Sequence, residues 1–185
     1  VVMVLPSQAG EENLANYRQL AETWKDQKGD EFSIVLDSEL GELPADAGVW
    51  VLGWENAWFK AVEEGLADYD AELAKSSVRF GATSHDPADN SFVVALRHPH
   101  NTDLAMAWLT IDKAEAVAGL ARKLPHYGKY SYLGFTGDEP TNSAKGQWPA
   151  VGSPLAADLQ EYSVELPQLE KRPALAMLAP GFNAQ

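Results

Sequence analysis

The sequence predicts an α/β domain with a mainly parallel, possibly mixed sheet and helices on both faces, a three-layer Rossmann- or flavodoxin-like architecture. Two observations support this prediction. Short continuous apolar runs alternate with segments of helical periodicity over residues 1–66. Those runs lack polar alternation, which is typical of strands buried on both faces. We expect the α/β domain over residues 1–154 and an extended tail or interdomain linker over residues 155–185.

Seven apolar runs predict strands. They cover residues 1–5, 32–36, 49–52, 78–81, 92–96, 104–109 and 130–135. Pro6 is expected to end the first strand, because proline cannot donate to a strand ladder. Residues 97–103 are rich in His, Pro, Asn and Asp and predict a loop.

Three segments with apolar side chains at helical spacing predict helices. They cover residues 11–28, 55–67 and 113–124. Gly29 is expected to end the first helix, Asp112 to open the third with a capping box, and Pro125 to end it. Residues 68–76 predict a helical turn or an excursion, and residues 136–154 are rich in turn formers.

The composition excludes several classes of chemistry. The chain contains no cysteine, which excludes disulfides, thiolate zinc sites, iron–sulfur clusters and cysteine nucleophiles. Its 27 acidic and 14 basic residues give a net charge of −13, which disfavours nucleic acid as a partner. No apolar run approaches the ~20 residues of a membrane span.

No complete catalytic motif is present. His-Glu-x-x-His, Gly-x-Ser-x-Gly and the glycine-rich phosphate loops are all missing. The sequence therefore predicts no catalytic, cofactor-binding or metal-binding residue in this domain. One alternative stays open, an independent hydrolase with a cryptic site. It would combine His98, His100 or His126 with a partner such as His85, Asp86 or Asp103.

Tryptophans gather at the end of the third predicted strand. Trp54, Asn56 and Trp58 follow this strand closely. In α/β sheets, ligands usually bind at the carboxyl ends of the strands, so these residues form a candidate binding surface. The alternative is core packing, with Asn56 as a helix cap.

A second candidate surface concentrates cations and aromatic side chains in an otherwise acidic chain. Its residues are Arg122, Lys123, His126, Tyr127, Lys129, Tyr130, Lys145 and Trp148. Such a patch is suited to docking a neighbouring domain or to binding an extended peptide. The alternative is an ordered loop held by aromatic packing.

Parts of both surfaces carry a family resemblance. The stretches 49–56, 121–133 and 137–149 resemble a region of large bacterial metallopeptidases. In these proteins an aminopeptidase-N-like (M1) module comes first, and an M28-like zinc aminopeptidase module can follow. The resemblance covers most of residues 48–154 and implies an accessory α/β domain beside those modules. It also implies zinc only in the parent's peptidase modules, and a periplasmic or exported parent.

These observations lead to one expected function and two alternatives. We expect a non-catalytic accessory or docking domain of a metallopeptidase-like parent. The chain begins inside an apolar run without an initiator methionine, as expected of a domain fragment. Its partners would be the neighbouring peptidase domains of the same polypeptide, or a peptide. The alternatives are a small-ligand or peptide-binding α/β module, and the cryptic hydrolase.

Overall fold

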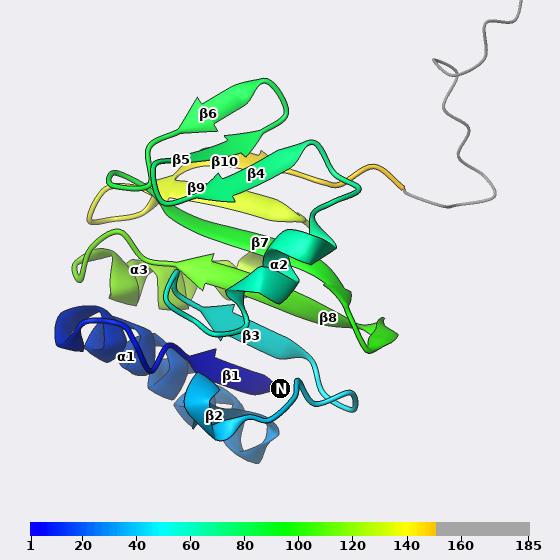
Figure 1. Cartoon of the computed structure of the whole chain (residues 1–185). Helices are drawn as coiled ribbons and strands as arrows, with labels where there is room; N and C mark the ends of the chain where they lie inside the picture. The colour runs from blue at the N-terminus through cyan, green and yellow to red at the C-terminus, as the bar shows by residue number, and fades with distance from the viewer. Residues whose placement is uncertain (151–185) are drawn as a thin grey trace, which may run out of the picture. The chain divides into compact units, whose positions relative to one another are not determined.

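A seven-stranded mixed sheet forms the centre of the computed structural model, which describes residues 1–150. Its strands are β1 (Val2–Leu5), β2 (Ser33–Leu36), β3 (Val49–Leu52), β7 (Ser91–His98), β8 (Asn101–Thr110), β9 (Tyr132–Thr136) and β10 (Thr141–Gly146). The strand order is β10-β9-β7-β8-β3-β1-β2 (Figure 1). Strands β8, β3, β1 and β2 run parallel, whereas β7, β9 and β10 add antiparallel pairings.

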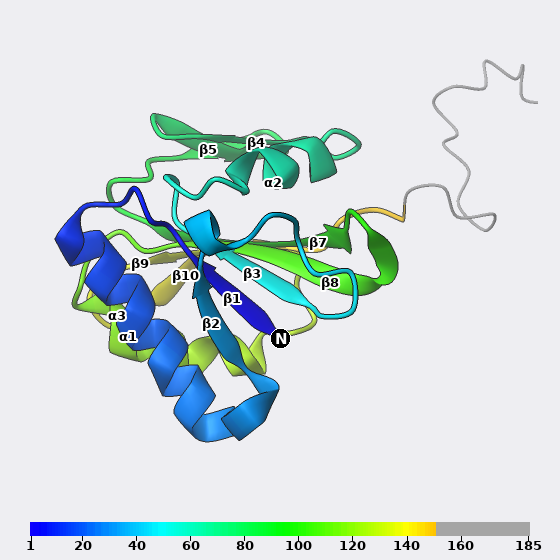
Figure 2. The same cartoon turned by 60° about the horizontal axis from the view of Figure 1, so that its bottom comes forward.

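The two faces of this sheet are covered differently. The remaining elements are α1 (Glu11–Lys28), α2 (Phe59–Gly65), α3 (Ala116–Lys123) and a small antiparallel sheet of β4 (Ala71–Ala74), β5 (Ser77–Phe80) and β6 (Thr83–His85). Helices α1 and α3 lie against one face, while α2 and the small sheet lie against the other (Figure 2). We call the first the helix face.

Each face has its own apolar core. On the helix face, Leu20 and Trp24 of α1 pack with Leu120 of α3 on the sheet. The indole Nε1 of Trp24 also donates to the carbonyl oxygen of Ala121 over 2.9 Å, so the two helices are joined directly. On the opposite face, Trp108 is completely buried. Each fully buried large apolar side chain contributes about 1.5–3 kcal/mol, so both layers stabilise the sheet.

The predicted three-layer Rossmann- or flavodoxin-like architecture is wrong. Half of the pairings in the main sheet are antiparallel, and one face is covered mainly by a second sheet rather than by helices. The cause lies in the connections. Only Pro99 and His100 separate β7 from β8, and a parallel crossover needs a dozen or more residues. The predicted loop over 97–103 is in fact a tight hairpin turn.

Several element boundaries also differ from the prediction. Strand β4 lies within residues 68–76, where a helical turn or an excursion was expected, β6 was not predicted as a strand, and β10 lies within the turn-rich segment 136–154. Helix α2 is shorter than predicted, and α3 begins only at Ala116. Asp112 does not cap α3, because its Oδ1 accepts the Ser91 hydroxyl at 2.5 Å.

Other features fit the expected pattern or cannot be compared. Helix α1 spans the predicted residues 11–28, and Gly29 follows it directly. Pro125 lies within a 3₁₀ turn, Leu124–His126, that continues from α3. The predicted tail over residues 155–185 lies outside the described residues. Within residues 1–150, no helix has the length and apolar character needed to cross a membrane.

Candidate functional site

The side chain of Asn56 fills the crevice between neighbouring strands in which many α/β proteins bind ligands. The chain leaves β1 toward α1 on the helix face and leaves β3 toward α2 on the opposite face, which makes a topological switch point between these strands. Asn56 is 4% exposed, and its Nδ2 donates to the carbonyl oxygens of Val4 at 2.8 Å and Leu52 at 3.1 Å. Its Oδ1 accepts the N–H of Trp58, directly before α2. This predicted site residue therefore links strands and orients a helix.

Asp37 ties the same loops together. It follows β2, is 3% exposed, and accepts the backbone N–H groups of Ser7 at 2.8 Å and Ala57 at 2.7 Å. Burial acts to raise the pKa of this carboxyl, but the hydrogen bonds from Ser7, Ala57 and Ser38 outweigh burial and hold the pKa below its usual value. The side-chain amide of Asn56 and the carboxylate of Asp37 thus occupy the topological switch point.

A polar cleft of about 250 Å³ lies beside this closed crevice. Its lining includes Tyr17, Trp54, Glu55, Thr110 and Asp112. The Tyr17 hydroxyl lies 3.4 Å from Thr110 Oγ1, and burial raises the pKa of Tyr17. Asp112 Oδ2 is buried without a hydrogen-bond partner among the described residues. The cleft can offer hydrogen bonds, but it is smaller than the roughly 300–1,000 Å³ of typical small-molecule pockets.

The tryptophans of the two predicted surfaces pack against different partners. Trp54 lines the polar cleft, and its ring lies 4.6 Å from that of Trp108. Trp148 stacks on Tyr69 at 4.8 Å, and its Nε1 donates to the carbonyl oxygen of Ala95 at 2.9 Å. Trp58 is half-buried, and its Nε1 finds no hydrogen-bond partner within residues 1–150.

The helix face carries a different feature, a chain of three adjoining hollows of about 240, 260 and 510 Å³. The first and second share Trp50 and Leu124, and the second and third share Gln27, Lys28 and Pro125. We call this series of neighbouring hollows the helix-face groove. The first hollow lies over the amino-terminal half of β3 and the middle of β8, away from the closed crevice.

Small side chains on the sheet create the first hollow. Ala95 of β7 pairs with Ala107 of β8, and Ala107 pairs in turn with Trp50 of β3. Two residues further along these strands, on the same face, the larger side chains of Val93 and Leu109 fill the corresponding space under α3. Because alanine side chains are short, the sheet surface is recessed at Ala95 and Ala107. Ala105 extends this recessed surface, which forms the floor of the first hollow.

Tyrosines form the wall of this hollow. Tyr127 and Tyr130 follow the 3₁₀ turn after α3, and both line the first hollow. The hydroxyl of Tyr127 donates to Asn142 Oδ1 over 2.8 Å, which fixes the loop to β10. Arg122 pairs with Glu139 at 2.9 Å, and Lys123 donates to the carbonyl oxygen of Pro140. These contacts hold α3 and its loop against the β9–β10 hairpin.

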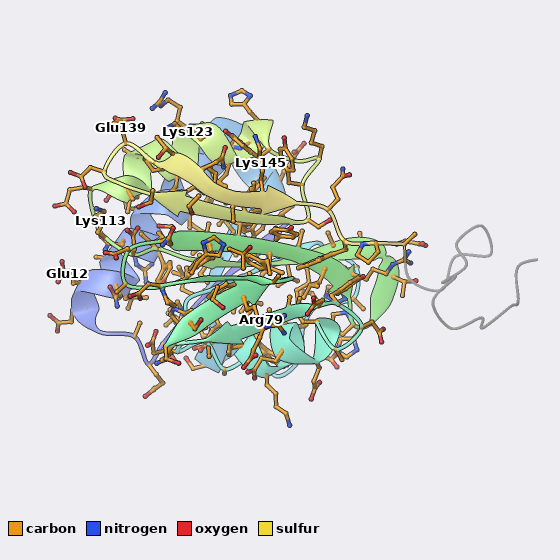
Figure 3. All side chains as sticks on the ribbon, turned by 90° about the horizontal axis from the view of Figure 1, so that it is seen from above. Glu12, Arg79, Lys113, Lys123, Glu139 and Lys145 are labelled. Carbon is orange, nitrogen blue, oxygen red and sulfur yellow. The ribbon has the colours of Figure 1, made fainter. Side chains whose placement is uncertain are left out.

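The groove is positively charged at its rim. Lys28 lines its second and third hollows, and Arg122 and His126 line the third. Lys129 and Lys145 place their Nζ atoms 5.2 and 5.8 Å from the centre of the Tyr130 ring, within the range of cation–π attraction. Figure 3 shows Lys123 and Lys145 toward one side of the molecule and Arg79 of the small sheet toward the other.

The histidines do not form the cryptic site of the hydrolase alternative in the described part of the chain. His98 is fully buried, and its Nδ1 accepts the backbone N–H of His100 at 3.2 Å. Burial and the neighbouring His100 lower the pKa of His98. His126 is exposed on the turn after α3, and His85 packs beside Phe92. Residues 1–150 contain no group of three or more His, Asp or Glu side chains placed to hold a metal ion.

Sequence reasoning found only part of the groove. It singled out Arg122, His126, Tyr127 and Tyr130, which line the groove, but it missed the alanine floor. The available signal was the alternation of small and large residues from Leu104 to Leu109. Comparison of the chain with protein-family models gives no match, and comparison with curated proteins gives none. The metallopeptidase relationship therefore stays a prediction.

Proposed function

We propose that this domain is a docking module that holds an extended polypeptide segment in the helix-face groove. The observation that carries the proposal is the succession of three neighbouring hollows with common lining residues, from the alanine floor, past the shared Trp50 and Leu124, to residues of α1 and α3. In a larger metallopeptidase-like parent, the segment would come from a neighbouring module.

The shape of the groove favours a chain over a compact ligand. Two of its hollows are individually smaller than the roughly 300–1,000 Å³ of small-molecule pockets. An extended segment can place successive side chains in successive hollows, as in other peptide-binding grooves. The aromatic side chains of Trp50, Tyr127 and Tyr130 are of the kinds that dominate protein interfaces.

A modest affinity is sufficient for this role. When two modules belong to one polypeptide, a short flexible linker sets an effective concentration in the millimolar range. A groove with a weak affinity for free peptide therefore still holds its segment within the same chain. This fits an accessory domain whose parent supplies the catalytic zinc.

The test selects peptides on the full chain from a displayed library of random 12-residue sequences. Backbone and methyl NMR shifts then map where the selected peptides bind. We expect the shifts to centre on Ala95, Ala105 and Ala107. Ala105→Phe, which fills the groove at an exposed position, should weaken binding at least tenfold, or by about 1.4 kcal/mol.

Thr102→Phe provides the matched control. Thr102 is exposed on the same strand and is not among the residues that line the groove. This variant adds the same aromatic ring, and it should bind the selected peptides like the unmodified chain. Peptides whose shifts centre elsewhere, or an Ala105→Phe variant that folds and still binds fully, would contradict the docking function.

A further inference from the structure

The charge of the groove identifies the chemistry of its occupant. Building on the proposed docking function, we infer that the segment bound in the helix-face groove is acidic as well as apolar, with carboxylates flanking the side chains that enter the hollows. Lys28, Lys129 and Lys145 would receive these carboxylates.

The absence of acidic residues in the groove is the first observation. None of the described residues that line its three hollows is acidic, although the chain contains 27 acidic residues. The polar cleft on the same domain is different, since Glu55 and Asp112 both line it. An acidic partner bound in the groove would therefore meet less electrostatic repulsion than at other surfaces of this acidic molecule.

The convergence of Lys129 and Lys145 is the second observation. They come from two different segments, the loop after α3 and strand β10, yet both Nζ atoms approach the ring of Tyr130, which lines the groove. Gln147 Nε2 donates to the carbonyl oxygen of Lys129 at 2.6 Å, which holds the loop beside the strand. Because both ammonium groups lie near the same ring, a carboxylate close to that ring would be attracted by both.

These cations are available for a partner. Lys28, Lys129 and Lys145 are exposed and form no ion pair within residues 1–150, whereas Lys75, Lys113 and Arg122 are paired with carboxylates. Lys28 lines the second and third hollows, and the other two lysines border the first. An extended segment along the groove therefore meets these cations beside the first hollow and where the second hollow adjoins the third.

A peptide suits this surface better than a nucleic acid does. The apolar floor and the tyrosine wall offer burial to side chains, and the lining residues among positions 1–150 include no row of cations to follow a phosphate backbone. The net charge of −13 also opposes the approach of a polyanion. A short segment with both acidic and apolar residues can place carboxylates beside the lysines at the rim and apolar side chains in the hollows.

The experiment uses the full chain and three fluorescein-labelled 12-residue peptides. All three have leucine and phenylalanine at the same alternate positions, with glutamate, glutamine or lysine between them. Fluorescence anisotropy should give the tightest binding for the glutamate peptide, by at least tenfold over the lysine peptide. Raising NaCl from 50 to 500 mM should weaken the glutamate peptide several-fold and leave the glutamine peptide nearly unchanged, because salt screens exposed charges.

Charge-reversal variants locate the effect. Lys129→Glu and Lys145→Glu should each weaken the glutamate peptide by about three- to tenfold, with little effect on the glutamine peptide. Lys60→Glu is the matched control, because it makes the same charge change on α2, where Lys60 is 82% exposed and lies 3.7 Å from Glu64. Its affinity for the glutamate peptide should stay within twofold.

The outcomes separate this inference from the function on which it rests. If all three peptides bind equally and Ala105→Phe weakens each of them, the docking function holds and the preference for acidic segments is overturned. If no peptide binds, or if Ala105→Phe has no effect, the docking function itself fails. A 12-nucleotide single strand that binds more tightly than the glutamate peptide would overturn the inference in favour of nucleic acid.

Discussion

The side-chain amide of Asn56 donates a 2.8 Å hydrogen bond to the carbonyl oxygen of Val4 and so joins the loop after β3 to strand β1. A second bond from the same nitrogen reaches Leu52. In many α/β proteins a ligand occupies this position between two strands. Here a buried side chain occupies it, and the surface best suited to a partner lies at the other end of the same strands.

Asn56→Ala should destabilise the domain strongly. The substitution removes three hydrogen bonds and leaves the buried carbonyl groups of Val4 and Leu52 without this donor. We expect a loss of about 2–4 kcal/mol in the free energy of unfolding, measured by urea titration. Asn13→Ala, at an exposed position of α1, should cost less than about 0.5 kcal/mol. Equal effects of the two variants would contradict a structural role for Asn56.

Asp37 should make stability depend on acidic pH. Its hydrogen bonds lower the pKa in the folded state, so the unfolded state binds the proton more readily. The stabilisation is therefore complete above the unfolded pKa of about 3.9 and is lost as the pH falls through the folded pKa. Asp37→Asn should lower the urea midpoint at pH 7 and flatten its decline below pH 4. Asp46→Asn, at an exposed position, should leave both unchanged.

His98 should weaken the fold at mildly acidic pH. Burial and His100 lower its pKa from the usual value of 6.5, so the unfolded state takes up the proton first. Stability is then complete above about pH 6.5 and declines as the pH falls toward the folded pKa. His98→Leu should remove this decline between pH 7.5 and pH 5 in thermal melts. The exposed His126 offers the control, since His126→Leu should preserve the decline.

Gly119→Ala should lower stability although alanine favours helices. A Cβ at Gly119 would overlap the ring of Pro140, where α3 contacts the turn between β9 and β10. The gain in helix propensity is about 1 kcal/mol, and overpacking costs about 1–3 kcal/mol. We expect a net loss of up to about 2 kcal/mol by urea titration. Ala118→Gly, at the exposed neighbouring position, measures the propensity alone. A stabilised Gly119→Ala variant would show that the turn moves without cost.

Six of the seven strands of the main sheet were predictable from sequence, but β10 and the antiparallel direction of three pairings were not. Residues 1–5, 11–28 and 49–52 form a strand, a helix and a strand close to their predicted bounds, because continuous apolar runs and a helical stripe are strong signals. The strands of the small sheet have only three or four residues, and β6 is largely exposed. Such segments resemble turns in sequence, so β4 and β6 were not predicted as strands, whereas β5 was expected over residues 78–81.

The groove shows why binding surfaces are harder to predict than elements. Its wall was visible in sequence, because Tyr127 and Tyr130 stand in a segment rich in cations and aromatic side chains. Its floor comes from Ala95 and Ala107, which become neighbours only through the pairing of β7 with β8. Alanine is common in buried strands and does not by itself indicate a binding surface. These alanines mark a hollow only because the covering helices do not extend over them.

The strand order has a consequence for how the chain folds. Two of the three antiparallel pairings, β7 with β8 and β9 with β10, join neighbours in sequence, and Pro99 and His100 alone connect β7 to β8. The pairing of β3 with β8 spans all of α2 and the small sheet, and the Trp108–Gly53 hydrogen bond links residues 55 apart in the chain. Local pairs close quickly, whereas distant pairs must first overcome a larger loop entropy. Pulsed hydrogen exchange should therefore protect β7 and β8 in their shared hairpin first, and the amides of β1 and β3 last.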